Sequence, residues 1–324
     1  MTPPSAHAAP EPATATLDQV RQRLNELYGQ SEVATEKYNA ADEKARSHQK
    51  KVDALKGQVK LATQKETRLK SLLGAAARAQ YRGAGVPAVA QFLLSSDPEN
   101  ALASAALARQ AEHGASEKLE ALETTRQGLR KRADKAAAEL EGLRASRRDK
   151  DKNRAKIEDR IATARALESQ LEKKDLRRIA ELDKRADNRT QNEWVDTGVL
   201  NEVGTEASAA GRRAIAYASQ QLGKPYVWGA EGPDSFDCSG LTSQAWLHAG
   251  VAIPRTSEEQ WAQLKHVPVS RMRPGDLIIY YSDAHHVAIY TGGGKIIQAP
   301  RTGRPVYVSP AGSMPILGVV RPDA

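Results

Sequence analysis

The chain has 324 residues, enough for two domains of ordinary size, and it carries a formal net charge of +8 with only 5% aromatic residues. Positive and negative residues alternate and stacking aromatics are scarce, so the composition argues against a nucleic-acid-binding protein. No apolar run approaches the roughly 20 residues of a membrane span, and a single cysteine excludes an internal disulfide.

Charge and aromatic residues are distributed unevenly along the chain. Residues 1–200 hold 37 Lys and Arg against 30 Asp and Glu but only one of the four Trp, whereas residues 201–324 hold 11 against 10. This asymmetry predicts an elongated first part and a compact second part. The basic excess of the first part fits attraction to an anionic surface, such as a bacterial wall.

Residues 1–16 form a Pro- and Ala-rich polar stretch, which we expect to be a disordered tail. Such a tail fits the start of a mature secreted chain whose leader has been removed. An ordinary disordered N-terminus fits it equally well.

The next part has a helical pattern. From Leu17 to Ala76 apolar residues recur every three or four positions, a heptad signal that predicts a long helix in need of a partner. A second helical stretch follows the Gly- and Pro-containing segment 83–98, which we expect to form the tip of a hairpin. The spacing predicts a helical coiled-coil hairpin over 17–186, with heptads that can pair within or between chains. Residues 187–208 lose the heptads and are expected to be a linker.

Residues 209–324 have a different pattern. An opening helix is followed by a second over 238–249, and then by short β-branched or aromatic runs split by Gly, Pro and Asp. These runs lie at 276–281, 286–291, 295–300, 306–309 and 316–320. Helices followed by consecutive strands predict an α+β fold with an antiparallel sheet.

Cys238 stands at the first turn of the second of these helices, with Ser235 or Asp237 as the candidate N-cap. Unpaired N–H groups and the helix dipole stabilise an anion there, so we expect the pKa of the thiol to be lowered and the thiolate to act as a nucleophile. A buried, inert cysteine is the alternative for an isolated residue, and a nearby base would argue against it.

Of the seven histidines, His286 is the base that we choose. His248 is on the same helix as Cys238 but ten residues along, about 15 Å away on the axis. His285 and His286 open a strand on opposite faces, and His286 shares its face with the small Ala288, which leaves room for a reacting group.

Gln298 is the candidate to orient that imidazole. The segment 286–300 is expected to form a hairpin with a Gly-rich turn, and a turn centred on Gly292 sets His286 opposite Gln298. The amide oxygen of Gln298 could then accept from a ring nitrogen. An ordinary polar strand residue is the alternative.

Five blocks of the second part resemble, in order, those of NlpC-type cell-wall cysteine peptidases: GKPYVWGAEGPDSFDCSGL, IPRTSEEQ, RPGDLIIYY, HHVAIYTGGG and IIQAP. The resemblance covers about residues 212–324, and the helical part resembles more loosely the coiled-coil regions of secreted actinobacterial members. It implies a papain-like α+β fold, a secreted or cell-wall location, and hydrolysis of peptidoglycan stem peptides. The usual bond joins γ-D-glutamate to diaminopimelate or lysine.

The resemblance also implies roles for single residues. Cys238 matches the nucleophile, His286 the base and Gln298 the third polar position, which is often histidine in this family. The matched substrate-binding positions are Tyr226 near the nucleophile, Asp237 and Ser239 beside it, and Arg255 and Ser257 at the expected rim of the groove. No cofactor is expected, and no Cys/His cluster predicts a metal site.

A second class of function fits the same sequence: a non-catalytic scaffold that grips stem peptides while the coiled coil binds a cell-division or export partner. For the enzyme, we expect the helical part to regulate or localise it. The segment 194–204, WVDTGVLNEVG, is the candidate cover for the cleft.

Overall fold

The structure, a computed structural model, describes residues 16–83 and 98–324. The expected disordered tail and the expected hairpin tip therefore lie almost wholly outside the described residues. The chain divides into two compact units, and each is described by itself: one contains residues 1–43 and 147–324, and the other contains residues 44–146.

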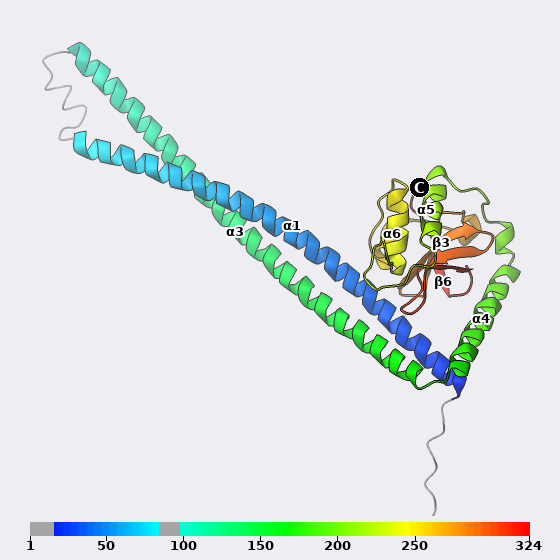
Figure 1. The fold of residues 1–324 in the computed structure, drawn as a ribbon. Coiled ribbons are helices and arrows are strands. Elements are labelled where there is room, and N and C mark those ends of the chain that lie inside the picture. Colours follow the sequence, from blue (N-terminus) through cyan, green and yellow to red (C-terminus); the bar gives the residue numbers. More distant parts are fainter. Residues whose placement is uncertain (1–15, 84–97) are drawn as a thin grey trace, which may run out of the picture. The chain divides into compact units, whose positions relative to one another are not determined.

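Long helices make up the first half of the chain (Figure 1). They are α1 (Leu17–Gly83) and α3 (Pro98–Ser169), followed after a three-residue break by α4 (Lys173–Asp196). The second helical stretch is thus interrupted before residue 186. The segment 187–208, expected to be a linker, is helical to Asp196 and contains a short 3₁₀ helix, η1 (Val199–Asn201).

In the first unit, the apolar side of α1 packs on α3 and α4. Leu27 and Tyr28 lie against Ala164 of α3 and Ile179 of α4. About two turns further on, Ala34 packs with Ile157 and Ile161 of α3. The three helices therefore share one apolar seam where they meet.

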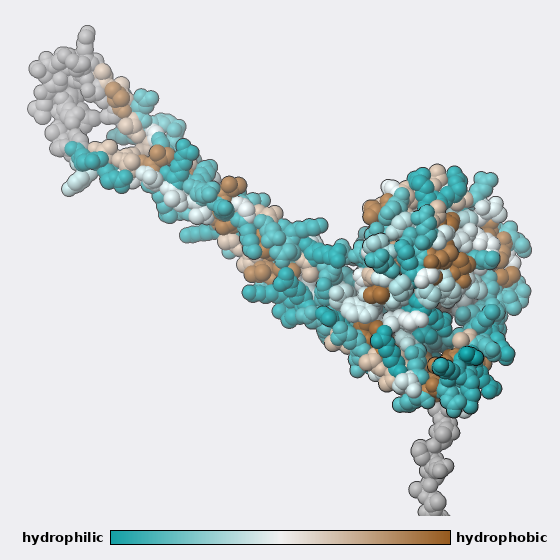
Figure 2. Space-filling model, in the orientation of Figure 1, coloured by the Kyte–Doolittle hydropathy of each residue, from teal (hydrophilic) through white to brown (hydrophobic). Residues whose placement is uncertain are grey.

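In the second unit, α1 and α3 bury few side chains. The buried side chains of α1 in this unit are Ala45 and Val52, whereas Leu61 is 68% exposed. Figure 2 shows hydrophobic side chains scattered along these helices among hydrophilic ones. Charged pairs such as Arg126 with Glu66 lie between the helices.

The rest of the first unit is an α+β domain with a six-stranded sheet, as the sequence predicted. Its helices are α5 (Ala209–Gln220), α6 (Cys238–His248) and α7 (Ser257–Gln263). Its strands are β1 (Lys265–Val267), β2 (Leu277–Tyr280), β3 (His286–Gly292), β4 (Lys295–Gln298), β5 (Tyr307–Pro310) and β6 (Ile316–Arg321). All pairings are antiparallel in the order β1-β6-β2-β3-β4-β5. The sequence reading missed α7 and β1.

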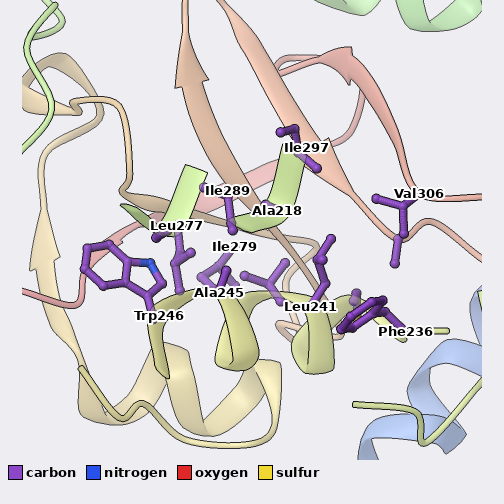
Figure 3. Close-up of a cluster of buried hydrophobic side chains, with 14 of the residues drawn as sticks. Ala218, Phe236, Leu241, Ala245, Trp246, Leu277, Ile279, Ile289, Ile297 and Val306 are labelled. Atoms are coloured by element: carbon purple, nitrogen blue, oxygen red, sulfur yellow. The ribbon is translucent and has the colours of Figure 1, made fainter. Parts of the chain in front are cut away.

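Each face of the sheet carries its own hydrophobic core. On one face, α5 and α6 pack over β2 and β3, and Figure 3 shows Leu241, Ala245 and Trp246 of α6 directed toward Leu277 and Ile289. The other face holds the second cluster, which includes Ile278, Tyr280, Ala288 and Tyr290. Alternation along β3 therefore sends successive side chains to two different cores.

The β3–β4 register differs from the expected one by two residues. Ile289 lies opposite Ile297 and Tyr290 opposite Ile296, because the turn uses three glycines with positive φ, Gly292 to Gly294. A shift of two keeps every side chain on its face. His286 and Gln298 therefore remain on the same face as diagonal neighbours rather than as direct partners.

Candidate active site

The start of α6 is held by Asp237, the N-cap. Its carboxylate accepts from the Gly240 N–H at 2.6 Å, and Arg255 grips both of its oxygens, at 3.0 and 2.7 Å. A side chain at position 240 would come within 2.2 Å of the Ala230 carbonyl oxygen, so a glycine is needed there. These contacts fix Cys238 at the first turn of the helix, as the sequence predicted.

The position of Cys238 at the helix start does not lower the pKa of its thiol. Cys238 is 1% exposed, and burial, followed by the charges of Glu36 and Asp237, raises the pKa of its thiol well above the ordinary value. The expectation of a lowered pKa is wrong for this form of the chain. It considered the helix start alone, whereas desolvation and carboxylates dominate here.

A hydrogen-bonded chain orients the imidazole of His286. The Gln298 amide donates to the hydroxyls of Ser309 at 2.6 Å and Tyr307 at 3.4 Å, which leaves its oxygen for His286 Nε2 at 2.7 Å. That network assigns the ring proton to Nε2. His286 Nδ1 is buried, has no hydrogen-bond partner among the described residues, and is therefore the nitrogen able to accept a proton.

Helix α1 fills the groove at the thiol. The Glu36 carboxylate lies 3.7 Å from Cys238 Sγ, accepts from the Ser239 hydroxyl at 2.8 Å, and accepts from the Ser257 N–H at 2.7 Å. Burial, then the charges of Asp237 and Glu258, raises the pKa of Glu36 to about 8. A carboxyl group of the chain itself therefore lies directly beside the Cys238 thiol.

Further contacts continue along α1 on both sides of Glu36. Residues four apart share one side of a helix, so the helix meets the groove along its length. The contacts are Tyr28 with Arg301 at 3.8 Å, Glu32 with His286 Nδ1 at 3.4 Å, Tyr38 with Trp228 at 5.2 Å between ring centroids, and Asn39 with Asp237 at 3.0 Å. The sequence reading missed Glu32, Glu36 and Asn39, because they fall between the apolar positions of the heptad pattern, as solvent-facing residues of a helix do.

The candidate substrate-binding residues come together around the thiol, but not as a rim. Arg255 and Ser257 are buried beneath Glu36, and Ser239 hydrogen-bonds to both Glu36 and Arg255. Burial, followed by the neighbouring Cys238 and Asp237, raises the pKa of Tyr226, which belongs to the same buried cluster as Cys238. The buried Ser257 hydroxyl has no partner among the described residues.

The candidate cover 194–204 lies elsewhere. Trp194 and Val203 pack against the cluster of Ile278 and Tyr290, on the sheet face away from α6. That prediction is wrong, because this segment is needed to cover an apolar sheet face. The segment that enters the groove is instead residues 32–39 of α1.

Beside His286 the groove is not filled. A cavity of about 390 Å³ lies between α1, α4 and the sheet domain. Its lining includes Asp187, Tyr281, His286, Gln298, Arg301 and Tyr307. Glu36 thus occupies the site at Ser239 and Ser257, whereas the space beside His286 is open.

Two wider searches concern only the residues that the structure describes. None of their helices has an apolar stretch long enough to cross a membrane. Nor do they contain a group of three or more His, Cys, Asp or Glu residues suited to a metal ion.

Residues 223–315 match the NlpC/P60 family. A probable endopeptidase of Corynebacterium glutamicum is 39% identical over 127 residues, or 39% of this chain and 60% of that protein. A probable endopeptidase p60 of Listeria grayi is 41% identical over 118 residues, or 36% of this chain and 23% of that protein. The solved structure of a hypothetical invasion protein of Mycobacterium tuberculosis is 36% identical, covering 35% of this chain and 62% of that one with a TM-score of 0.31. The chain spans less than two thirds of the length of these relatives.

Proposed function

Because residues 223–315 belong to the NlpC/P60 family, we propose that the chain is a cysteine endopeptidase that cuts peptidoglycan stem peptides between γ-D-glutamate and diaminopimelate or lysine. The relatives named probable endopeptidases support the reaction class. The observation that carries the proposal is that Cys238, at a helix start, and the His286 imidazole contact two residues one turn apart on α1, Glu36 and Glu32. A secreted or cell-wall location follows from this substrate.

The reaction is acyl transfer. His286 Nδ1 takes the thiol proton of Cys238, and the thiolate attacks the γ-glutamyl carbonyl carbon. The Cys238 N–H, with the Tyr226 hydroxyl, holds the oxyanion. The imidazolium then gives its proton to the leaving amine, and water activated by the same imidazole hydrolyses the thioester. Gln298 keeps the ring oriented, and because it is neutral it does so without a carboxylate's charge.

In the form described, the enzyme is held closed by the helical part. Glu36 excludes substrate from Cys238, and burial, together with the nearby carboxylates of Asp237 and Glu32, keeps the thiol neutral. The helix leaves the Ser257 hydroxyl and His286 Nδ1 without a hydrogen bond, with only the Glu32 carboxylate near Nδ1 at 3.4 Å, as expected if the groove is built for another ligand. Withdrawal of residues 32–39 would both open the groove and lower the pKa of the thiol. We propose that the long helices, paired as a coiled coil, transmit a partner's binding to this segment.

Digestion of purified muropeptides tests the reaction. The chain opened by Glu36→Arg should cut stem peptides on the carboxyl side of γ-D-glutamate, located by mass spectrometry. The same chain with Cys238→Ala should show no cut, with far-UV circular dichroism confirming its fold. Full hydrolysis by the Cys238→Ala chain would overturn the assignment of the nucleophile.

A stem-peptide-binding scaffold remains the second candidate, and the filled groove with its neutral thiol favours it. Iodoacetamide separates the two functions in the opened Glu36→Arg chain. An enzyme's Cys238 should alkylate faster than a free cysteine at pH 7, since thiolate reacts and thiol does not. A binder's thiol should alkylate no faster than the free cysteine.

A further inference from the structure

The contacts of α1 give the groove a direction. Read along the helix, Asn39 meets Asp237, Glu36 meets Cys238, Glu32 meets His286, and Tyr28 meets Arg301. In the proposed reaction, the imidazole that receives the thiol proton delivers it to the leaving amine. The leaving residue must therefore lie on the His286 side, where the cavity of about 390 Å³ is open.

That cavity holds two charges of opposite sign without ion-pair partners. Arg301 is half-buried and stacks on the Tyr28 ring at 3.8 Å, and no carboxylate lies within ion-pair distance of it among the described residues. Asp187 is also half-buried, and no Lys or Arg side chain of the described residues lies within ion-pair distance of it. The neighbouring charges, Arg304 and Asp183, instead form an ion pair with each other at 2.9 Å. A partly desolvated charge without a partner is costly, so each of the two is suited to a charged ligand group.

The wall that carries Asp187 is fastened to the sheet domain independently of α1. On α4, the Gln191 side chain accepts from the Gly312 N–H at 2.6 Å and donates to the Gly294 carbonyl at 3.3 Å. Trp194 packs against Gly312 and the second core cluster. Withdrawal of α1 would thus leave Asp187 and Arg301 facing the same space.

We propose that this cavity receives the leaving residue and selects a diamino acid whose far end carries both an ammonium and a carboxylate, with Asp187 binding the ammonium and Arg301 the carboxylate. This rests on the proposed function. Tyr281 and Tyr307 flank the space between them and would pack on the aliphatic part. Diaminopimelate has both end groups, whereas lysine has only the ammonium. The chain therefore prefers diaminopimelate, and helix α4 forms part of the specificity site.

The kinetic test compares two stem peptides that differ only in diaminopimelate or lysine. In the opened Glu36→Arg chain, kcat/KM should favour diaminopimelate by about tenfold, the factor expected for a charge-assisted hydrogen bond. Adding Arg301→Gln should bring the ratio near one by slowing the diaminopimelate peptide, and Arg301→Lys should restore part of it. Asp187→Asn should slow both peptides. Arg178→Gln, at an exposed position of the same helix α4, is the control. An unchanged ratio in Arg301→Gln overturns the proposal.

A binding test separates this proposal from the reaction. The full chain with Cys238→Ala should bind free diaminopimelate about tenfold more tightly than lysine by calorimetry, and Arg301→Gln should remove the difference. If the opened chain cuts neither peptide but this preference holds, the proposed reaction fails and the site stands. Equal binding of the two amino acids overturns the site, whatever the outcome for hydrolysis.

Discussion

Two stretches of α1 share one apolar periodicity but bury different chemistry. Within 31–39, the side chains of Ser31, Thr35, Glu36 and Asn39 are all at most 4% exposed, and Glu36 and Asn39 bind groups of the groove. Within 44–82, the buried residues among the described side chains are Ala45 and Val52. Buried polar groups are costly unless paired. The first stretch is therefore fitted to the groove, whereas the second makes ordinary helix contacts.

The largest expected effect comes from a substitution that disrupts the contacts between the first stretch and the groove. Glu36→Arg places a second guanidinium beside the buried Arg255 and removes the acceptor of Ser239 and Ser257. Burying an unpaired charge of this kind is strongly unfavourable, so the closed form should be lost. Muropeptide hydrolysis should rise about 100-fold or more over the wild type, measured by chromatography of the products.

Two controls bracket that variant. Gln30→Arg adds the same side chain at an exposed position of α1 directly before the first stretch, and Leu61→Arg adds it at an exposed position of the second. Both should leave hydrolysis at the wild-type rate. A rise in either control equal to that of Glu36→Arg would mean that any added cation loosens the helices, and the comparison of the two stretches would fail.

The next effect concerns the groove that the first stretch covers. Gln298→Leu in the opened chain removes the acceptor of His286 Nε2, so the ring loses its fixed orientation and tautomer. We expect kcat to fall about tenfold or more with KM nearly unchanged. Gln298→His should recover part of the rate. A kcat unaffected by Gln298→Leu would remove Gln298 from the proposed triad.

Much of this site follows from the sequence by local rules. The N-cap Asp237, the helix start at Cys238 and the shared face of His286 and Gln298 depend on caps and strand alternation, both short-range. The expected contact between His286 and Gln298 was correct despite an error of two residues in the strand register, because side chains two residues apart lie on the same face of a strand. The opening helix and most strands were also found, whereas the three-residue β1 and seven-residue α7 are too short for a periodic signal.

Other features lie beyond local rules. Glu36 is about 200 positions from Cys238 in the chain, and nothing in its heptad setting distinguishes it from a solvent-facing residue of the helix. The direction of the thiol's pKa shift depended on this distant contact, so the helix-start argument gave the wrong sign. The role of 194–204 depended on which sheet face lacked cover, which the strand pattern leaves open.

A smaller effect is the pH dependence of opening. In the closed form the pKa of Glu36 is about 8, against 4.5 ordinarily, so between these values the closed form holds a proton that the open form releases. Raising the pH from about 5 to 8 must therefore favour opening, by up to about tenfold per pH unit. Asp237, Glu258 and Glu32 add repulsion once Glu36 ionises, and Arg255 opposes them.

The ratio of two alkylation rates isolates this dependence. Iodoacetamide labelling of Cys238 rises with pH in any variant, because more thiolate forms. Dividing the labelling rate of the wild type by that of the Glu36→Gln chain removes this common pH dependence, because glutamine cannot ionise at position 36. The ratio should climb severalfold per pH unit between 6 and 8. A flat ratio would show that the Glu36 proton does not control opening.

The smallest expected effect is a difference in thermal stability between two substitutions, one near each stretch. The Tyr28 hydroxyl donates to Glu168 at 2.9 Å in a partly buried setting, so Tyr28→Phe should lower the unfolding free energy by about 1 kcal/mol. Arg126→Met, on α3, breaks a surface pair with Glu66 of the second stretch and should leave the thermal midpoint unchanged. Differential scanning calorimetry compares the two. Equal midpoint shifts would contradict the difference between the stretches.

The central claim, that α1 holds Cys238 covered and neutral, is tested most directly by its alkylation rate in the intact wild-type chain at pH 7. We predict a rate about 100 times or more below that of the Glu36→Arg chain, counted by mass spectrometry of the single modified residue. Equal rates in the two chains would contradict the claim, since the thiol would then be open and reactive with the helix unaltered.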